Sequence, residues 1–240
     1  MVKKSGKYDA SGMVEAQFEP GSRGRVLKNL PGIKKKREID LLEAEEQGRI
    51  LVKIVGKYDI SHRFTAKDIC AMHKAWLGSI YSWAGKYRAV NISKDGFSFA
   101  AAQHIPSLMQ ELEKGALREF TPCRFSSLDE VAKTIAVVHV ELVLIHPFRE
   151  GNGRVARILA ILMALQAGLP PLNFAGIKGK KRREYFAAVR AGLYRDYKPM
   201  EEVFRLIIAR TLKIPKKNWG GHYGGGSASG FGFWDGTGSG

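Results

Sequence analysis

Apolar residues recur every three or four positions through most of this chain, from about residue 38 to residue 214. That spacing is typical of helices with one buried face. The first helix is marked by Ile39, Leu42, Ile50, Leu51 and Ile54. A second is expected to begin after Thr65, whose hydroxyl suits an N-cap, and to run to Ile80.

Five further helices are expected, and one of them should lie at the centre of the fold. Their ranges are 105–112, 127–145, 153–166, 181–193 and 200–212. The helix at 127–145 is apolar on nearly every side between Ile135 and Ile145, which predicts a central, buried position. The helix at 153–166 is followed by Gly168 and Pro170, which is typical of a helix end.

The pattern changes from helical to alternating around Val90. The pair Asp95-Gly96 lies between Ile92 and the alternating stretch Phe97-Ser98-Phe99. Asp-Gly between extended segments is typical of a tight β-hairpin turn. A hairpin at 86–99 cannot bury its own side chains, so it should lie on the helices. The predicted fold class is therefore all-α, with one small β-hairpin.

Composition divides the chain into three parts. Residues 1–37 contain Pro-Gly pairs and end in a run of four basic residues, which predicts a basic, extended and solvated arm. Residues 38–214 form the predicted helical domain. Residues 215–240 form a tail that holds 10 of the chain's 27 glycines, a density that no packed core tolerates.

The balance of charge favours anionic partners. The chain has 39 Lys and Arg against 23 Asp and Glu, a formal net charge of +16. Its two cysteines cannot form a disulfide framework, and no CxxC pair could hold a structural zinc. No stretch looks like a signal peptide or reaches the roughly 20 apolar residues of a membrane span. We therefore expect a cytoplasmic protein without a membrane partner.

One segment carries most of the candidate chemistry, and it joins the two most apolar helices. It reads His146-Pro147-Phe148-Arg149-Glu150-Gly151-Asn152-Gly153-Arg154-Val155-Ala156-Arg157. Pro147 should end the preceding helix and leave His146 at its C-terminal edge. Gly151 and Gly153 permit positive φ, so that successive N–H groups can converge just before the next helix. Such a nest at a helix N-terminus binds anions.

The side chains around this nest suit a bound nucleotide. Arg154 and Arg157 are three residues apart and share one helix face, where they could clamp two phosphates. Glu150 is a single carboxylate, which suits Mg²⁺ completed by phosphate oxygens and water. His146 could accept a hydroxyl proton near neutral pH. These groups together predict nucleotidyl or phosphoryl transfer from a nucleoside triphosphate.

Each of these features also has an ordinary structural interpretation. A histidine at a helix end is usually a cap or a core group, an arginine is usually a solvated charge, and Gly-x-Gly is usually a turn. Four such features lie within twelve residues, between two helices that are too apolar for the surface. That concentration favours the functional interpretation.

The segment resembles the signature of the Fic family (filamentation induced by cyclic AMP), His-Pro-Phe-x-(Asp or Glu)-Gly-Asn-Gly-Arg-x-x-Arg, and matches it at every specified position. The resemblance extends to Trp83-Ala84-Gly85-Lys86-Tyr87-Arg88 and to residues 90–99, which look like the family's flap hairpin and the segment leading into it. Residues 26–33 look like the lead-in of bacterial members. The resemblance covers about residues 25–212.

The resemblance implies a mainly helical fold and a protein adenylyltransferase, which moves AMP from ATP to a Ser, Thr or Tyr hydroxyl of a target protein and releases pyrophosphate. It makes His146 the general base, Phe148 the core anchor of the loop and Glu150 the Mg²⁺ ligand. It also assigns the anion hole and the phosphate contacts to Gly151, Asn152, Gly153, Arg154 and Arg157.

The family's flap pairs with an extended segment of the target through main-chain hydrogen bonds, so that the target adds a strand to the hairpin. By this resemblance, target docking is assigned to Val90, Asn91, Ile92, Ser93, Lys94, Gly96 and Phe97. The alternative is a hairpin that only covers the helices. An exposed strand edge needs a use or a protection, which favours docking.

The sequence leaves regulation and rival functions open. Many Fic enzymes carry an inhibitory helix with (Ser or Thr)-x-x-x-Glu-(Gly or Asn), which this chain lacks; Ser126 and Glu130 have the spacing, but Val131 follows. We therefore expect inhibition by a separate small antitoxin. The alternatives are a protein kinase or other nucleotidyltransferase of the same fold, and a basic nucleic-acid-binding or interaction protein, for which no motif is found. Nucleic acid is not an expected partner, and a homo-oligomer stays open.

Overall fold

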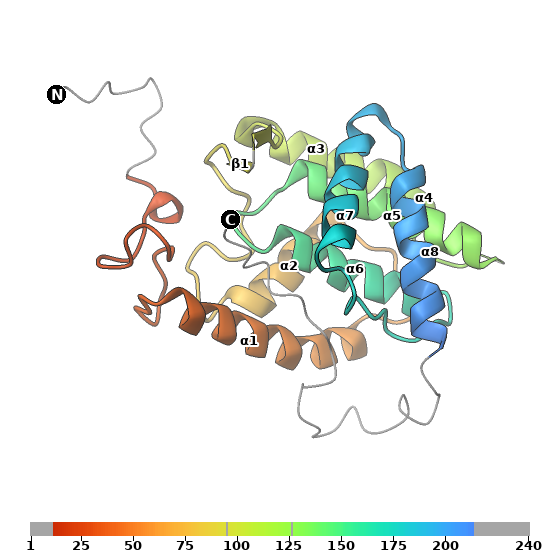
Figure 1. The fold of residues 1–240 in the computed structure, drawn as a ribbon, viewed down its shortest axis with the longest axis horizontal. Coiled ribbons are helices and arrows are strands. Elements are labelled where there is room, and N and C mark those ends of the chain that lie inside the picture. The colour runs from red at the N-terminus through yellow and green to blue at the C-terminus, as the bar shows by residue number, and fades with distance from the viewer. Residues whose placement is uncertain (1–11, 95, 126, 214–240) are drawn as a thin grey trace.

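The computed structural model describes residues 12–94, 96–125 and 127–213, and the glycine-rich tail predicted for residues 215–240 lies outside them. Helices dominate the described residues, and a two-stranded hairpin accompanies them (Figure 1). The predicted fold class is confirmed. No helix in this part of the chain is long and apolar enough to cross a bilayer.

The elements follow one another in a simple order. The helices are α1 (Lys36–Lys57), α2 (Ala66–Leu77), α3 (Ile105–Leu112), α4 (Arg118–Phe120), α5 (Leu128–Ile145), α6 (Asn152–Gln166), α7 (Lys180–Ala191) and α8 (Lys198–Leu212). The strands β1 (Ser93–Lys94) and β2 (Phe97–Ser98) lie between α2 and α3. Short 3₁₀ turns occupy Val14–Ala16, Ala102–His104 and Gly192–Tyr194, and a π turn occupies Glu113–Leu117.

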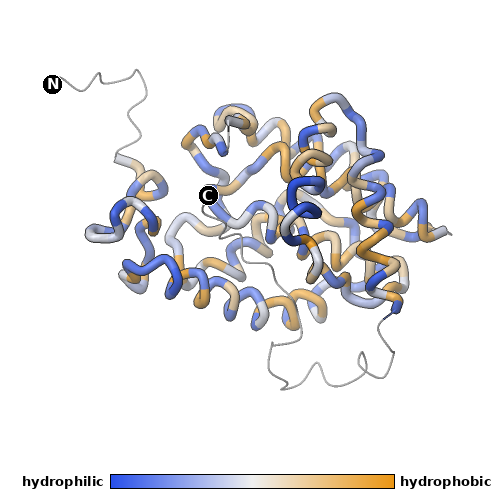
Figure 2. Tube along the Cα trace, viewed as in Figure 1, coloured by the Kyte–Doolittle hydropathy of each residue, from blue (hydrophilic) through white to orange (hydrophobic). Residues whose placement is uncertain are grey.

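Two helices form the centre of the bundle. α5 and α6 bury most of their residues and pack against each other, as the apolar pattern predicted. α8 packs along α5 and α7 packs on α8, while α1 and α2 pair on another side, where α2 contacts α6 (Figure 1). Figure 2 shows hydrophilic residues gathered at the start of α1 and in the first turns of α7. The cavity described below lies between these groups of helices.

Local chemistry sets the ends of α2. The Thr65 hydroxyl accepts the Asp68 N–H at 3.2 Å, and the Asp68 carboxylate accepts the Thr65 N–H at 3.0 Å, which completes a capping box. The helix ends at Leu77 rather than at Ile80, because Gly78 is a poor helix former and the Ile80 N–H turns back to the Leu77 carbonyl.

The hairpin lies where the sequence predicts it, but its strands are shorter than the predicted segment. Ser93 faces Ser98 and Lys94 faces Phe97 in an antiparallel register. Residues 88 and 89 do not extend the ladder, because the Arg88 N–H donates to the Pro147 carbonyl. The next N–H, that of Ala89, donates to the carboxylate of Glu15 at 2.7 Å.

The described part of the predicted N-terminal arm is mostly exposed, but a few of its residues pack on the helical domain. Val26 is 1% exposed and belongs to the core, and the Leu30 N–H donates to the Ile80 carbonyl at 2.8 Å. Asn29 holds the turn before α1, because its side chain bonds the backbone of Leu27 and Ile33. α1 then begins at Lys36, inside the range predicted for the arm. Burial of an apolar side chain such as that of Val26 is favourable, and a fully solvated arm would forgo that stabilisation.

Candidate active site

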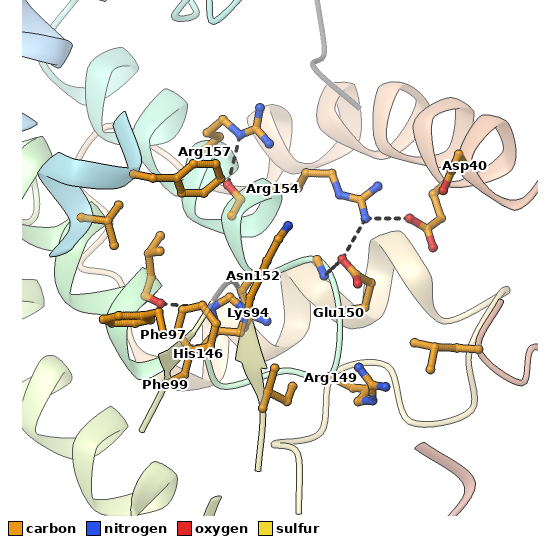
Figure 3. A pocket seen from close by; sticks show the side chains of 18 of the residues that line it. Asp40, Lys94, Phe97, Phe99, His146, Arg149, Glu150, Asn152, Arg154 and Arg157 are labelled. Carbon is orange, nitrogen blue, oxygen red and sulfur yellow. Dashed lines mark hydrogen bonds and ion pairs between the residues drawn. The ribbon is translucent and has the colours of Figure 1, made fainter. Parts of the chain in front are cut away.

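A cavity of about 830 Å³ opens at the end of the bundle where α5 passes into α6. Its walls come from α1, the hairpin, the loop at 146–151, the start of α6, and α7 (Figure 3). Most of the predicted site residues line it: Ile92, Ser93, Lys94, Phe97, His146, Glu150, Gly151, Asn152, Gly153, Arg154 and Arg157. The other predicted flap residues, Val90, Asn91 and Gly96, lie in the same hairpin but are not part of the lining.

His146 ends α5 in the left-handed conformation, with φ 53° and ψ 57°. Pro147 disfavours the right-handed helical region for this residue, so the chain leaves the helix there. The ring atom Nδ1 lies 3.1 Å from the Val143 carbonyl, and a proton on Nδ1 leaves Nε2 as the basic atom. Burial lowers the pKa of His146 to about 4. The imidazole is therefore neutral, and able to accept a proton, throughout the physiological pH range.

The loop after His146 is anchored in the core by Phe148, as the resemblance implied. Phe148 is fully buried and stacks on His73, with ring centroids 3.8 Å apart. The Asn152 side chain clamps the same residue, since it donates to the Phe148 carbonyl at 2.7 Å and accepts the Phe148 N–H at 2.8 Å. The amide group of Asn152 is thus occupied within the loop, and its backbone N–H is the group left to face an anion.

Gly151 starts α6 from a backbone conformation that suits glycine, with φ +83°. A Cβ atom here would lie 2.7 Å from Cζ3 of the buried Trp76, so no other residue fits without a shift. The first N–H groups of a helix have no partner inside it, and in α6 these belong to Asn152 and Gly153. Free N–H groups at a helix N-terminus, together with the helix dipole, suit an anion, which is what the sequence predicts for this position.

Arg154 is held on three sides. Its guanidinium pairs with Glu43 of α1 at 2.6 Å and with Glu150 at 3.4 Å, and it lies 4.6 Å above the ring of Trp76. Glu43 is 3% exposed and also accepts the hydroxyl of Tyr81 at 2.6 Å. Burial works against the charged form of Arg154, but the two carboxylates outweigh it and raise the pKa of Arg154. The position of the Arg154 guanidinium is therefore fixed before any ligand binds.

Arg157 is buried deeper in the same wall. The residue is 8% exposed. Its Nε donates to the Gly153 carbonyl at 3.1 Å, and its guanidinium lies 5.9 Å from the ring centroid of Phe174. Burial lowers the pKa of Arg157 to about 10, so the group stays charged at neutral pH. A buried cation of this kind favours an anion in the cavity.

Glu150 offers a carboxylate at the mouth of the cavity, where 47% of its side chain is exposed. Burial of its charge works to raise the pKa of Glu150, but Arg154, the Gly151 N–H and His146 outweigh this and lower it below its ordinary value. The ionised group fits a Mg²⁺ ion that takes its other ligands from phosphates and water. The described residues contain no cluster of three or more metal-ligating side chains, so a cage built by protein alone is not present in them.

The hairpin covers the histidine and reaches across to α7. The ring of Phe99 stacks on His146 with centroids 3.6 Å apart. At the other end, Lys94 lies 6.0 Å from the ring centroid of Phe186, and Arg190 lies 5.8 Å from that of Phe97. The hairpin and α7 thus form one rim of the cavity beside the imidazole (Figure 3).

Residues 63–164 match the sequence model of the Fic/DOC family. Protein adenylyltransferase VbhT of Bartonella schoenbuchensis is 33% identical over 169 residues, which are 68% of this chain and 33% of that protein. The N-terminal Fic domain of a VirB-translocated Bep effector from Bartonella quintana superposes with a TM-score of 0.65 at 26% identity, over 79% of this chain and 90% of that one. This chain belongs to the Fic/DOC family.

A second Bartonella quintana Fic domain structure, which has ADP bound, superposes with a TM-score of 0.65 at 25% identity, over 81% of this chain and 95% of that one. The chain spans about a third of the length of the curated relatives it matches. The Fic domain is therefore the part that these proteins share with it.

Several residues that build this Fic site were not predicted from the sequence. They are Glu43, His73, Trp76, Arg88 and Phe99, all far from the motif along the chain. Glu43 carried a signal, because it lies on the same helix face as Ile39 and Ile50 and is a charged residue among apolar ones. His73 joins Gly85 to the loop: the Gly85 N–H donates to its Nδ1, and Nε2 lies 2.9 Å from the Glu150 carbonyl.

Proposed function

We propose that this chain is a protein adenylyltransferase, which transfers AMP from ATP to a Ser, Thr or Tyr hydroxyl of a target protein and releases pyrophosphate. The observation that carries the proposal is a neutral His146 next to the N-terminus of α6, with Arg154 and Arg157 in the same wall. Its relatives VbhT and Nematostella vectensis Fic bear the name protein adenylyltransferase, which supports it.

In the proposed reaction His146 acts on the target hydroxyl, and the N-terminus of α6 acts on the α-phosphate. Nε2 of His146 removes the proton of the target hydroxyl as its oxygen attacks the α-phosphorus, and the bond from that phosphorus to the pyrophosphate oxygen breaks. A general base contributes on the order of 10²-fold to 10⁴-fold. The N–H groups of Asn152 and Gly153 stabilise the negative charge that builds up on the α-phosphate, and loss of such a donor costs on the order of 10²-fold to 10³-fold.

Arg154 and Arg157 would hold the β- and γ-phosphates of ATP. Arg154 is oriented by Glu43 and Trp76, so it loses little freedom on binding. Glu150 would hold a Mg²⁺ ion, which neutralises charge on the departing pyrophosphate when it is bound. The ADP bound to the Bartonella quintana Fic domain supports the binding of a nucleotide by this chain.

The hairpin would dock the target. Ser93, Lys94 and Ser98 are exposed, so the strand edges are open to an added strand. Asn91 fixes the base of the hairpin, because its side chain accepts the Ala102 N–H at 2.9 Å. The stack of Phe99 on His146 joins the hairpin to the proposed general base. A target strand paired with the hairpin would therefore present its hydroxyl near Nε2.

The test is transfer of label from ATP to protein. The purified chain is incubated with Mg²⁺, a bacterial lysate and ATP labelled either on the α- or on the γ-phosphate. We expect a protein band labelled only from the α-phosphate, and none with His146→Ala. Label from the γ-phosphate would mean a kinase, and undiminished label with His146→Ala would contradict the assignment of the base.

We further propose that a separate small antitoxin restrains the activity in the cytoplasm. The support is the missing inhibitory pattern in the sequence, and the two free cysteines, Cys70 and Cys123, fit a reducing compartment. The chain alone should then label its target without any activating substitution. A chain that is inactive until one of its own helices is altered would contradict this proposal.

A further inference from the structure

Arg88 is the buried cation whose role the proposed chemistry leaves unexplained. It is 2% exposed and lies just before the hairpin. Its Nε donates to the His146 carbonyl at 2.7 Å, its Nη1 to the Val90 carbonyl at 2.6 Å, and its Nη2 to the Ala100 carbonyl at 2.6 Å. A longer contact of 3.4 Å joins Nη2 to the Ile145 carbonyl. One side chain therefore serves four backbone groups.

These carbonyls come from two places that must be aligned for the proposed reaction. Val90 and Ala100 lie on either side of the two hairpin strands, while Ile145 ends α5 and His146 caps it. The backbone of Arg88 adds a further link, because its N–H donates to the Pro147 carbonyl at 2.8 Å. The guanidinium thus joins both ends of the hairpin to the residue that carries the base.

This arrangement is unusual for a core position. Burial disfavours the charged form and lowers the pKa of Arg88, an effect that Glu15 opposes and Arg149 adds to. The bonds are made to carbonyl dipoles, and within residues 12–94, 96–125 and 127–213 no carboxylate bonds the guanidinium. An apolar residue would fill the space without this desolvation. What an apolar residue cannot do is bond three chain segments at once, which a rigid fork of donors does.

We propose that Arg88 is a positioning residue that sets the register between the hairpin and His146. A target strand on the hairpin is then placed along its length so that its hydroxyl meets Nε2. The inference deepens the proposed function and rests on it. Lysine keeps the charge but is a single point donor, so Arg88→Lys should loosen the register while keeping a cation in the core.

The first experiment is hydrogen exchange, which needs neither substrate nor activity. In Arg88→Lys the amides of residues 90–100 should exchange at least about tenfold faster than in the wild type, while those of α5 keep their protection. Arg63→Lys is the control for the change from Arg to Lys itself, because Arg63 is exposed, also donates to a backbone carbonyl, that of Arg118, and does not line the cavity. Unchanged exchange in the hairpin, or equal acceleration in α5, would overturn the proposal.

The second experiment separates positioning from general damage. Transfer of AMP to water uses His146 and ATP but no docked target, so its rate reports the base and the nucleotide site alone. With Arg88→Lys we expect protein labelling to fall about 10²-fold and hydrolysis of ATP to AMP to stay within about threefold. A proportional fall in both rates would overturn the proposal. If the wild type labels no protein, the adenylyltransferase assignment fails, and hydrogen exchange still decides the role of Arg88.

Discussion

Glu43 of α1 and Arg154 of α6 form an ion pair 2.6 Å long in the wall of the cavity, where the Glu43 side chain is 4% exposed. A helix that precedes the matched family segment thereby helps to hold Arg154, one of the two proposed phosphate ligands. The carboxylate fixes the guanidinium before any ligand arrives, and it also places a negative charge where phosphates should bind. The two effects pull nucleotide affinity and stability in opposite directions.

Glu43→Gln should therefore destabilise the free chain and strengthen nucleotide binding. Loss of one partner of a buried pair costs about 3 kcal/mol of unfolding free energy. Without the Glu43 charge the cavity wall is more positive and attracts the phosphates, whose negative charge then balances that of Arg154. Thermal unfolding with and without ATP and Mg²⁺ should show a lower midpoint for the free variant and a larger shift on addition of nucleotide. Glu45→Gln, exposed on the same helix, should behave as the wild type. A smaller shift in Glu43→Gln would contradict the idea.

The rate of AMP transfer should depend on pH through His146. A base must be neutral, and burial lowers the pKa of His146 to about 4. The rate should therefore hold from pH 7 to about pH 5 and fall only below that, whereas a solvated imidazole would lose half its activity near pH 6.5. Initial rates are measured while circular dichroism confirms that the chain is folded. A fall in the rate centred near pH 6.5 would mean that the His146 ring is more exposed to water than it is in this structure.

Gly151→Ala should damage the fold, whereas Gly153→Ala should not. At Gly151 the new Cβ meets Trp76 at 2.7 Å and the backbone has φ +83°, so strain and overpacking together cost about 2–4 kcal/mol. At Gly153 nothing lies within 4 Å of a Cβ, and alanine favours the helix. Urea unfolding of the two variants measures the difference. Equal stability would show that the loop can move away from Trp76.

Three buried histidines should make the fold sensitive to acid. Burial lowers the pKa values of His73, His139 and His146 to about 4, 3 and 4. Between these values and the unfolded pKa near 6.5, the unfolded chain binds more protons, so stability falls as the pH falls. From pH 7.5 to 5.5 each histidine should remove about 1.4 kcal/mol. His139→Gln, whose amide can still bond Tyr185, should lose less in urea unfolding at the two pH values. An identical pH dependence would exclude His139 as a source.

The sequence predicted the motif loop, its two apolar helices and the position of the hairpin, because each depends on residues close together in the chain. Periodicity, Pro147 and the Asp95-Gly96 pair are sufficient for those features. It did not predict what Arg88 or Glu43 bond to, since Arg88 and His146 are 58 residues apart and their meeting depends on how helices pack. For Asn152, the sequence suggested an anion contact, and the side chain proved to clamp Phe148.

Glu15 bonds the Ala89 N–H through its carboxylate and the Arg149 Nε through its carbonyl. These two contacts connect the first described turn to both the start of the hairpin and the loop after His146. Arg25, Val26 and Leu27 of the same segment line the cavity. A fragment cut to residues 63–164 would therefore lack part of the cavity wall. The part of this chain that encloses the cavity therefore begins at or before Arg25, well upstream of the matched family segment.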